Sequence, residues 1–154
     1  MPTSDYLNLF LDAGITDRDA QEKYGRCLDV VLARDGIAVG DIIGVGEMVD
    51  DLCVVHRQAI TIVSEKGMFS KRVEVRRVAP LASIARVRKE IEGFKGRGGL
   101  SVITYDASGI EVGKLNWGLG GPDWVVPMAE RQSEHLFNVI SSAMDQRDGT
   151  RDTA

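Results

Sequence analysis

Residues 54–88 read VVHRQAITIVSEKGMFSKRVEVRRVAPLASIARVR. The stretch contains runs in which apolar and polar residues alternate, and short polar turns separate these runs. Alternation with a period of two is typical of β-strands that bury one face. Arg76 and Arg77 interrupt the alternation before Val78, so we expect a β-bulge that returns Val78 to the inner face. The centre of the chain is therefore predicted to be β-structure.

The flanking segments extend the same pattern. Residues 41–49 and 52–56 are β-rich, and residues 99–118 read as a hairpin with its turn at residues 106–109. Gly113 in the second arm of that hairpin indicates another bulge. We therefore expect an α+β fold that is mainly antiparallel β.

The N-terminal third is predicted to be a helical hairpin, which we assign to residues 1–36. Thr16 and Asp19 have the spacing of a capping box for its second helix, and Gly36 follows that helix as a stop signal. The hairpin has an apolar stripe that it must bury, either against the main body or against a second copy.

The C-terminal segment is predicted to be an amphipathic helix, because Leu136 and Ile140 fall on one apolar stripe. Residues 148–154 read as a flexible polar tail. Residues 37–147 are then the main domain.

A Lys-Gly turn at residues 66–67 precedes a basic strand, and the step Pro80-Leu81-Ala82-Ser83-Ile84 leads into the next strand. Together with seven short strands followed by one helix, these features resemble bacterial pleckstrin-homology-like (PH-like) domains over roughly residues 41–146. The turn HRQ and the long segment GLGGPDW depart from that pattern. The resemblance implies a seven-stranded barrel or pair of orthogonal sheets, capped by the C-terminal helix.

Composition is that of one globular domain of 154 residues, with 44% hydrophobic and 27% charged residues. Cys27 and Cys53 are too few for a disulfide scaffold and read as two reduced, buried thiols. The start of the chain lacks a signal-peptide pattern, and no run approaches the roughly 18 apolar residues of a membrane span. We therefore expect a cytoplasmic protein.

Charge is distributed unevenly along the chain. Residues 66–97 hold ten Lys or Arg against three Glu, a net +7, and the remainder holds nine basic and twenty acidic residues, a net −11, which sum to −4. If residues 71–79 and 83–91 pair as neighbouring strands, their arginines point outward together. This basic face is either a solvated lattice of ion pairs with Glu74 and Glu90 or a surface for an anionic partner. Its candidate residues are Arg72, Arg76, Arg86, Arg88, Lys95 and Arg97.

The segment EIEGFKGRGGLSV, residues 90–102, is rich in glycine and carries Lys95 and Arg97. It is not a P-loop, because it has no Gly-Lys-Ser/Thr and leads into a strand rather than a helix. A tight connection between strands is favoured, and an anion contact made by backbone N–H groups is the alternative.

Metal and catalytic signals are weak. Cys53 and His56 have a C-x-x-H spacing, but residues three apart on a strand face opposite ways. No nucleophile motif is present, so we expect no metal, no cofactor and no enzymatic activity.

Trp117, Leu119 and Trp124 flank a Gly-rich, Pro-containing segment. They indicate either a packed satellite core or a corner that contacts a protein.

These patterns predict a non-catalytic interaction or scaffolding module that binds a protein, including another copy of itself. The alternative is peripheral binding to an anionic surface, membrane phospholipid or nucleic acid, through the basic face. An enzyme with an unrecognised site is the third hypothesis.

Overall fold

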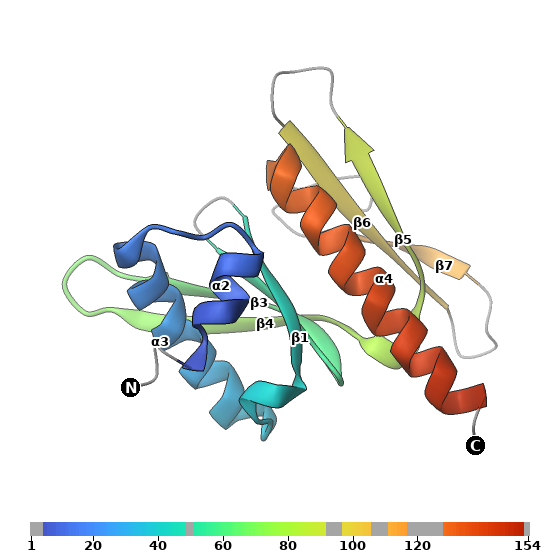
Figure 1. Cartoon of the computed structure of the whole chain (residues 1–154), viewed down its shortest axis with the longest axis horizontal. Helices are drawn as coiled ribbons and strands as arrows, with labels where there is room; N and C mark the ends of the chain where they lie inside the picture. Colours follow the sequence, from blue (N-terminus) through green and yellow to red (C-terminus); the bar gives the residue numbers. More distant parts are fainter. Residues whose placement is uncertain (1–4, 49–50, 92–96, 106–110, 117–127, 153–154) are drawn as a thin grey trace.

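The computed structural model of the chain describes residues 5–48, 51–91, 97–105, 111–116 and 128–152 (Figure 1). Two helices, α2 and α3, open the chain, and one long helix, α4, closes it. The helices are α2 (Leu7–Asp12), α3 (Arg18–Asp35) and α4 (Glu130–Asp152), with short 3-10 helices η1 (Val39–Asp41) and η2 (Leu81–Ser83). The strands are β1 (Ile42–Glu47), β2 (Leu52–His56), β3 (Ala59–Lys66), β4 (Arg72–Pro80), β5 (Ile84–Ile91), β6 (Arg97–Tyr105), β7 (Glu111–Asn116) and β8 (Met128–Ala129).

The strands form two antiparallel sheets. The first sheet has the order β1-β2-β3-β4, and the second has the order β5-β6-β7 with β8 paired to β6. An α+β fold with antiparallel sheets and a C-terminal helix is therefore confirmed. Among the described residues the sheets do not close into the expected barrel, and a short strand, β8, immediately precedes the last helix.

Both predicted bulges are present. In the β3–β4 ladder Ile60 pairs with Ala79 while Thr61 pairs with Arg77, so the bulge lies where it was predicted, but Val78 is itself the extra residue and the next residue, Ala79, is the one buried in the core. In the β6–β7 ladder, Thr104 pairs with Gly113 and Tyr105 pairs with Glu111, so the register also shifts beside Gly113. A bulge bends its strand and increases the local twist.

The first sheet is buried on both faces, which explains why every residue of β2 is buried. Alternate residues of β2 face opposite sides, as the strand period requires. One face joins a core that includes α4 and the second sheet: Cys53, Val55, Ile60, Ile62, Ile84, Leu100, Val102, Leu136 and Ile140. The other face joins a core under the N-terminal helices: Phe10, Tyr24, Leu28, Val31, Leu52, Val54 and Val63.

The helices at the two ends follow the sequence prediction with two differences. The side chain of Asp17, not Thr16, caps α3 by accepting a hydrogen bond from the Ala20 N–H at 2.9 Å, and Gly36 ends the helix in the left-handed conformation. The hairpin packs on the main body through its buried stripe. Helix α4 continues to Asp152, through most of the segment expected to be a tail, and its Leu136 and Ile140 are fully buried as predicted.

Helix α4 approaches β1 closely at two glycines. A Cβ atom at Gly44 would lie 2.7 Å from both γ-carbons of Val139, and one at Gly46 would overlap the Leu136 side chain. Only residues without a side chain allow this approach. The polar groups at the same junction are paired, because Gln132 accepts from the Glu47 N–H at 3.0 Å and donates to the Ala13 carbonyl at 2.7 Å.

We expect Gly46→Ala to lower the free energy of unfolding by about 1–3 kcal/mol, because the added methyl overpacks the contact with Leu136. Gly40→Ala is the matched control, since nothing lies within 4 Å of its Cβ position, and its change should stay within about 0.5 kcal/mol. Chemical denaturation followed by circular dichroism measures both. Equal stability of the two variants would show that β1 and α4 are not in contact at Gly46.

Candidate interaction site

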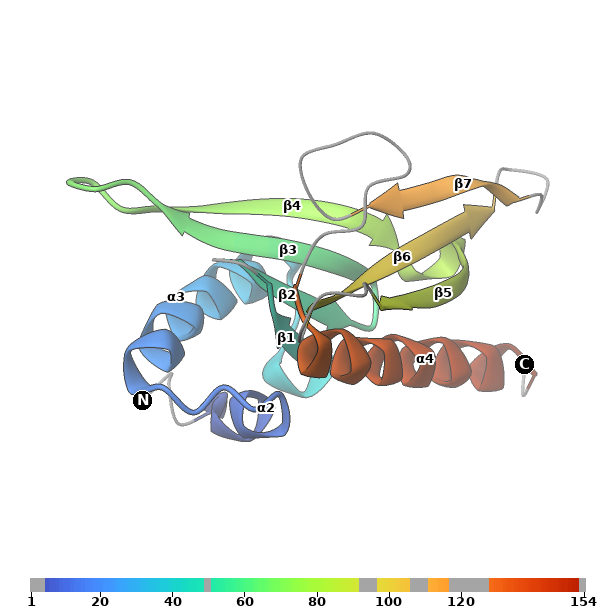
Figure 2. The ribbon, with the colours of Figure 1, turned by 90° about the horizontal axis from the view of Figure 1, so that it is seen from above.

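The β3–β4 hairpin extends away from the body of the molecule and ends in an apolar tip (Figure 2). Met68 is 89% exposed and Phe69 is 100% exposed, and the two residues are adjacent. Singly exposed apolar residues are common, but two large neighbours at the end of a projecting element indicate a contact surface. We call Met68 and Phe69 the hairpin tip.

The backbone of the turn determines how the hairpin tip is presented. Gly67 has φ of +106°, a conformation that side chains disfavour. A Cβ atom at this position would also overlap the Ser70 carbonyl oxygen. The turn therefore needs glycine at residue 67, and its geometry leaves the next two side chains in solvent.

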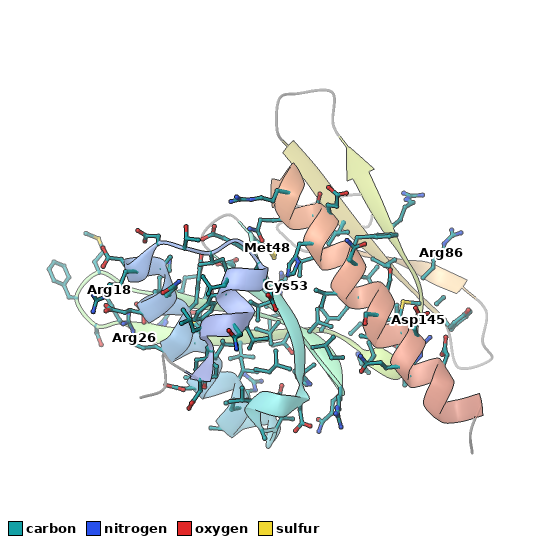
Figure 3. The ribbon with its side chains drawn as sticks, in the orientation of Figure 1. Arg18, Arg26, Met48, Cys53, Arg86 and Asp145 are labelled. Atoms are coloured by element: carbon teal, nitrogen blue, oxygen red, sulfur yellow. The ribbon has the colours of Figure 1, made fainter. Side chains whose placement is uncertain are left out.

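The base of the hairpin is attached to α3 by an ion pair. Arg26 donates from Nε and Nη2 to the two carboxylate oxygens of Glu65 at 2.8 and 3.0 Å, and Lys71 Nζ lies 3.8 Å from Glu65 (Figure 3). The hydrogen bond from Arg26 lowers the pKa of Glu65. Two-point Arg–carboxylate contacts are more directional than single ones, so this pair orients the hairpin.

The residues beside the hairpin tip are basic. Lys66, Lys71 and Arg72 are exposed, and no acidic residue occurs between Lys66 and Arg72. Outside that interval, Arg72 pairs with Glu74 at 3.1 Å and Lys66 lies 3.8 Å from Asp51. The apolar pair is thus flanked by cations whose acidic partners lie further from the tip.

The predicted basic face is divided by the fold. The face required residues 71–79 and 83–91 to pair, but in the described sheets β4 pairs with β3 and β5 pairs with β6. The reason is η2, which follows Pro80 and leads the chain from the edge of the first sheet to the edge of the second. Arg72 and Arg76 are exposed on the first sheet, whereas Arg86 and Arg88 are exposed on the second.

The other predicted sites lie largely outside the described residues. Lys95, Trp117, Leu119 and Trp124 are not described, and of Arg97 only the backbone is, at the start of β6. Gly98 and Gly99 pair with β5, so this half of the glycine-rich segment is strand, as its sequence indicated.

His56 is held inside the fold by hydrogen bonds to both ring nitrogens. It is fully buried, and its Nδ1 accepts from the Gln58 N–H at 3.2 Å, so Nε2 carries the hydrogen that Asp35 accepts at 2.9 Å. Both ring nitrogens are therefore used within the fold. Cys53 belongs to the core shared with α4, and no cluster of three metal-ligating side chains occurs among the described residues.

A polar cavity of about 370 Å³ lies beside the His56–Asp35 pair and is lined by Arg34, Asp35, Thr61 and Val75. The Thr61 hydroxyl is buried there without a hydrogen-bond partner, while Arg34 donates to the Val75 carbonyl at 3.2 Å. A buried hydroxyl of this kind is ordinarily satisfied by water. The cavity therefore brings together polar groups of Arg34, Asp35 and Thr61.

Comparison of the chain with models of protein families, with curated proteins and with solved structures finds no match in any of the three. No helix in the described part of the chain is both long enough and apolar enough to cross a membrane. The site must therefore be interpreted from its own residues.

Sequence reasoning missed the hairpin tip. The segment EKGMFSK is typical of a polar turn, because it contains a glycine and several charged residues. The available signal was the position of two large apolar residues in a short turn between strands, where neither can reach a core.

We expect both cysteines to be unreactive toward a thiol reagent at about pH 8 in the folded protein, because thiolate is the reactive form. Burial raises the pKa of Cys27 to about 11 and also raises the pKa of Cys53. A chromogenic disulfide reagent should titrate two thiols only after denaturation. Rapid reaction of one thiol in the native protein would contradict the buried environments.

Proposed function

We propose that this chain is a cytoplasmic, non-catalytic interaction module of the PH-like class that binds a protein partner, including another copy of itself. The observation that carries the proposal is the hairpin tip, where Met68 and Phe69 are almost wholly exposed on an element attached firmly to the body.

The order of the elements supports the PH-like class. Four antiparallel strands form one sheet, the next strands form a second sheet, and an amphipathic helix closes the fold against both. Figure 1 shows α4 running alongside β5 and β6 with its N-terminal end near β1. The assignment to this class rests on that order and on the local resemblance of residues 41–146.

Energetics favour a protein partner for the tip. Full burial of one large apolar side chain contributes roughly 1.5–3 kcal/mol, so Met68 and Phe69 together supply about 3–6 kcal/mol when a partner covers them. The ion pair between Arg26 and Glu65 holds the hairpin in place before binding, which reduces the entropy that association costs.

The internal polar contacts support a role without catalysis. Tyr6 donates to Asp29 at 2.6 Å and Tyr24 donates to Glu47 at 2.7 Å, so these groups join helices and strands to one another. Together with the His56–Asp35 pair, they hold elements of the fold in position through the buried side chains of Tyr6, Tyr24 and His56.

We expect Phe69→Ser to reduce the retention of a protein partner at least about tenfold. A tenfold loss corresponds to about 1.4 kcal/mol, which is less than the roughly 1.5–3 kcal/mol that burial of one large apolar side chain contributes. The measurement is mass spectrometry of proteins captured from a lysate of the source cells by the immobilised chain. Leu11→Ser is the control, since Leu11 is 49% exposed on α2, away from the hairpin. Identical capture by wild type and Phe69→Ser would exclude the hairpin tip as the contact.

A second candidate function is peripheral binding to an anionic surface, and it is favoured by the cluster of Lys66, Lys71 and Arg72. Each cation close to an anionic membrane contributes about 1 kcal/mol. The arginines of β5 lie on the other sheet, so this surface is smaller than the face that the sequence predicted.

For this second candidate, the protein should bind phosphatidylserine-containing vesicles at about 50 mM salt and lose most of that binding at about 200 mM salt. Lys71→Glu should weaken binding more than Arg57→Glu, a reversal of an exposed charge outside the hairpin. Vesicle co-sedimentation measures both. Binding that is absent at both salt concentrations removes this candidate.

A further inference from the structure

A groove between β5 and α4 offers a second surface on which apolar side chains lie beside charged ones. Its volume is about 230 Å³, and its apolar lining comes from Val87, Phe137 and Met144. All three side chains are partly buried and pack against the core that includes Leu136 and Ile140. The floor of the groove is therefore part of the rigid body of the molecule.

The size of the groove favours a side chain as its occupant. Small-molecule sites usually enclose roughly 300–1,000 Å³, which exceeds this groove. An aromatic side chain such as Phe69 presents a flat apolar surface, and a thioether beside it, as Met144 provides, makes a favourable sulfur–aromatic contact.

Two acidic residues at the edge of the groove are opposite in charge to the cations of the hairpin. Asp145 (Figure 3) and Asp148 line the groove from α4, where Asp148 also pairs with Arg147 at 2.9 Å, and Arg86 adds one cation from β5. The hairpin segment from Lys66 to Arg72 carries three cations and no acid. Opposite charges around an apolar contact fix its orientation and speed its formation.

The two surfaces lie at opposite ends of the molecule. Figure 1 places the β3–β4 hairpin at one end of the long axis, and Figure 3 shows Arg86 and Asp145 toward the other end. The hairpin tip therefore cannot enter the groove of its own chain. Any contact between them joins two copies.

We infer that the hairpin tip of one copy docks in the β5–α4 groove of a second copy, with Phe69 against Val87, Phe137 and Met144. This inference rests on the proposed function, because it identifies the partner of the hairpin tip. The contact is heterologous, since different surfaces of the two copies meet, and it leaves one free tip and one free groove in every dimer. Association is consequently head-to-tail and concentration-dependent. Its small area places it among weak, transient interfaces.

Complementary variants test the inference by analytical ultracentrifugation over a range of protein concentrations. Wild type should self-associate, whereas Phe69→Ser, which removes the tip, should lower the association constant at least about tenfold. Asp145→Lys, which reverses the charge of the groove, should lower it severalfold. Both residues are exposed, so neither change threatens folding. Leu11→Ser should behave as wild type.

The mixture of the two variants gives the decisive measurement. Phe69→Ser retains an intact groove, and Asp145→Lys retains an intact tip. A second groove variant, Ser141→Phe, blocks the groove sterically and also leaves the tip unchanged. Unlabelled Phe69→Ser should bind fluorescently labelled Asp145→Lys and Ser141→Phe with about the affinity of the wild-type contact, because the intact tip of each groove variant finds the intact groove of Phe69→Ser. In a head-to-tail contact these mixtures stop at one-to-one dimers, whereas each variant alone self-associates more weakly than wild type.

Three results would overturn the inference. Wild type that remains monomeric at high concentration excludes self-docking, and lysate capture that still depends on Phe69 would then leave the proposed function intact with a different protein as partner. Failure of the mixtures to form one-to-one dimers indicates a contact between like surfaces. Phe69-dependent binding to phosphatidylserine vesicles without self-association assigns the tip to a membrane.

Discussion

Burial of the first sheet on both faces is the constraint on which the rest of the structure depends. The strand period sends Cys53 and Val55 to one side and Leu52 and Val54 to the other, so a helical layer must cover each side. The N-terminal and C-terminal helices supply these layers, and they meet at Gln132, which contacts both β1 and the end of α2. The N-terminal and C-terminal helices thus cover opposite faces of the same four strands.

The hairpin extends beyond that doubly covered region, and its exposure follows from the same constraint. The ion pair between Arg26 and Glu65 joins α3 to the hairpin, and beyond it residues 66–72 are all exposed. Polar and charged residues accordingly flank the turn. Met68 and Phe69 are the exception, and an apolar pair held on a fixed support is already organised for binding.

The sequence predicted elements better than it predicted their partners. Alternation located the strands, and the broken alternation at Arg76-Arg77 located a bulge, because both are local properties of one strand. Alternation specifies which residues share a face but not which strand lies alongside, so the sequence left open whether the strands before and after Pro80 pair, and the structure places them in different sheets. Gly44 and Gly46 gave no sign of their function either, since the helix they accommodate lies some ninety residues further along the chain.

The distribution of charge favours a protein over a polyanion as the proposed partner. The basic segment is strongly positive in sequence, yet the fold separates its arginines between two sheets and pairs Arg72 with Glu74. The chain as a whole carries −4, so long-range attraction to a polyanion is weak. The apolar contact of the hairpin tip does not depend on net charge, and the cations around it act over short distances. A protein surface that combines a small apolar groove with acidic edges would cover the apolar tip and also pair with the cations beside it.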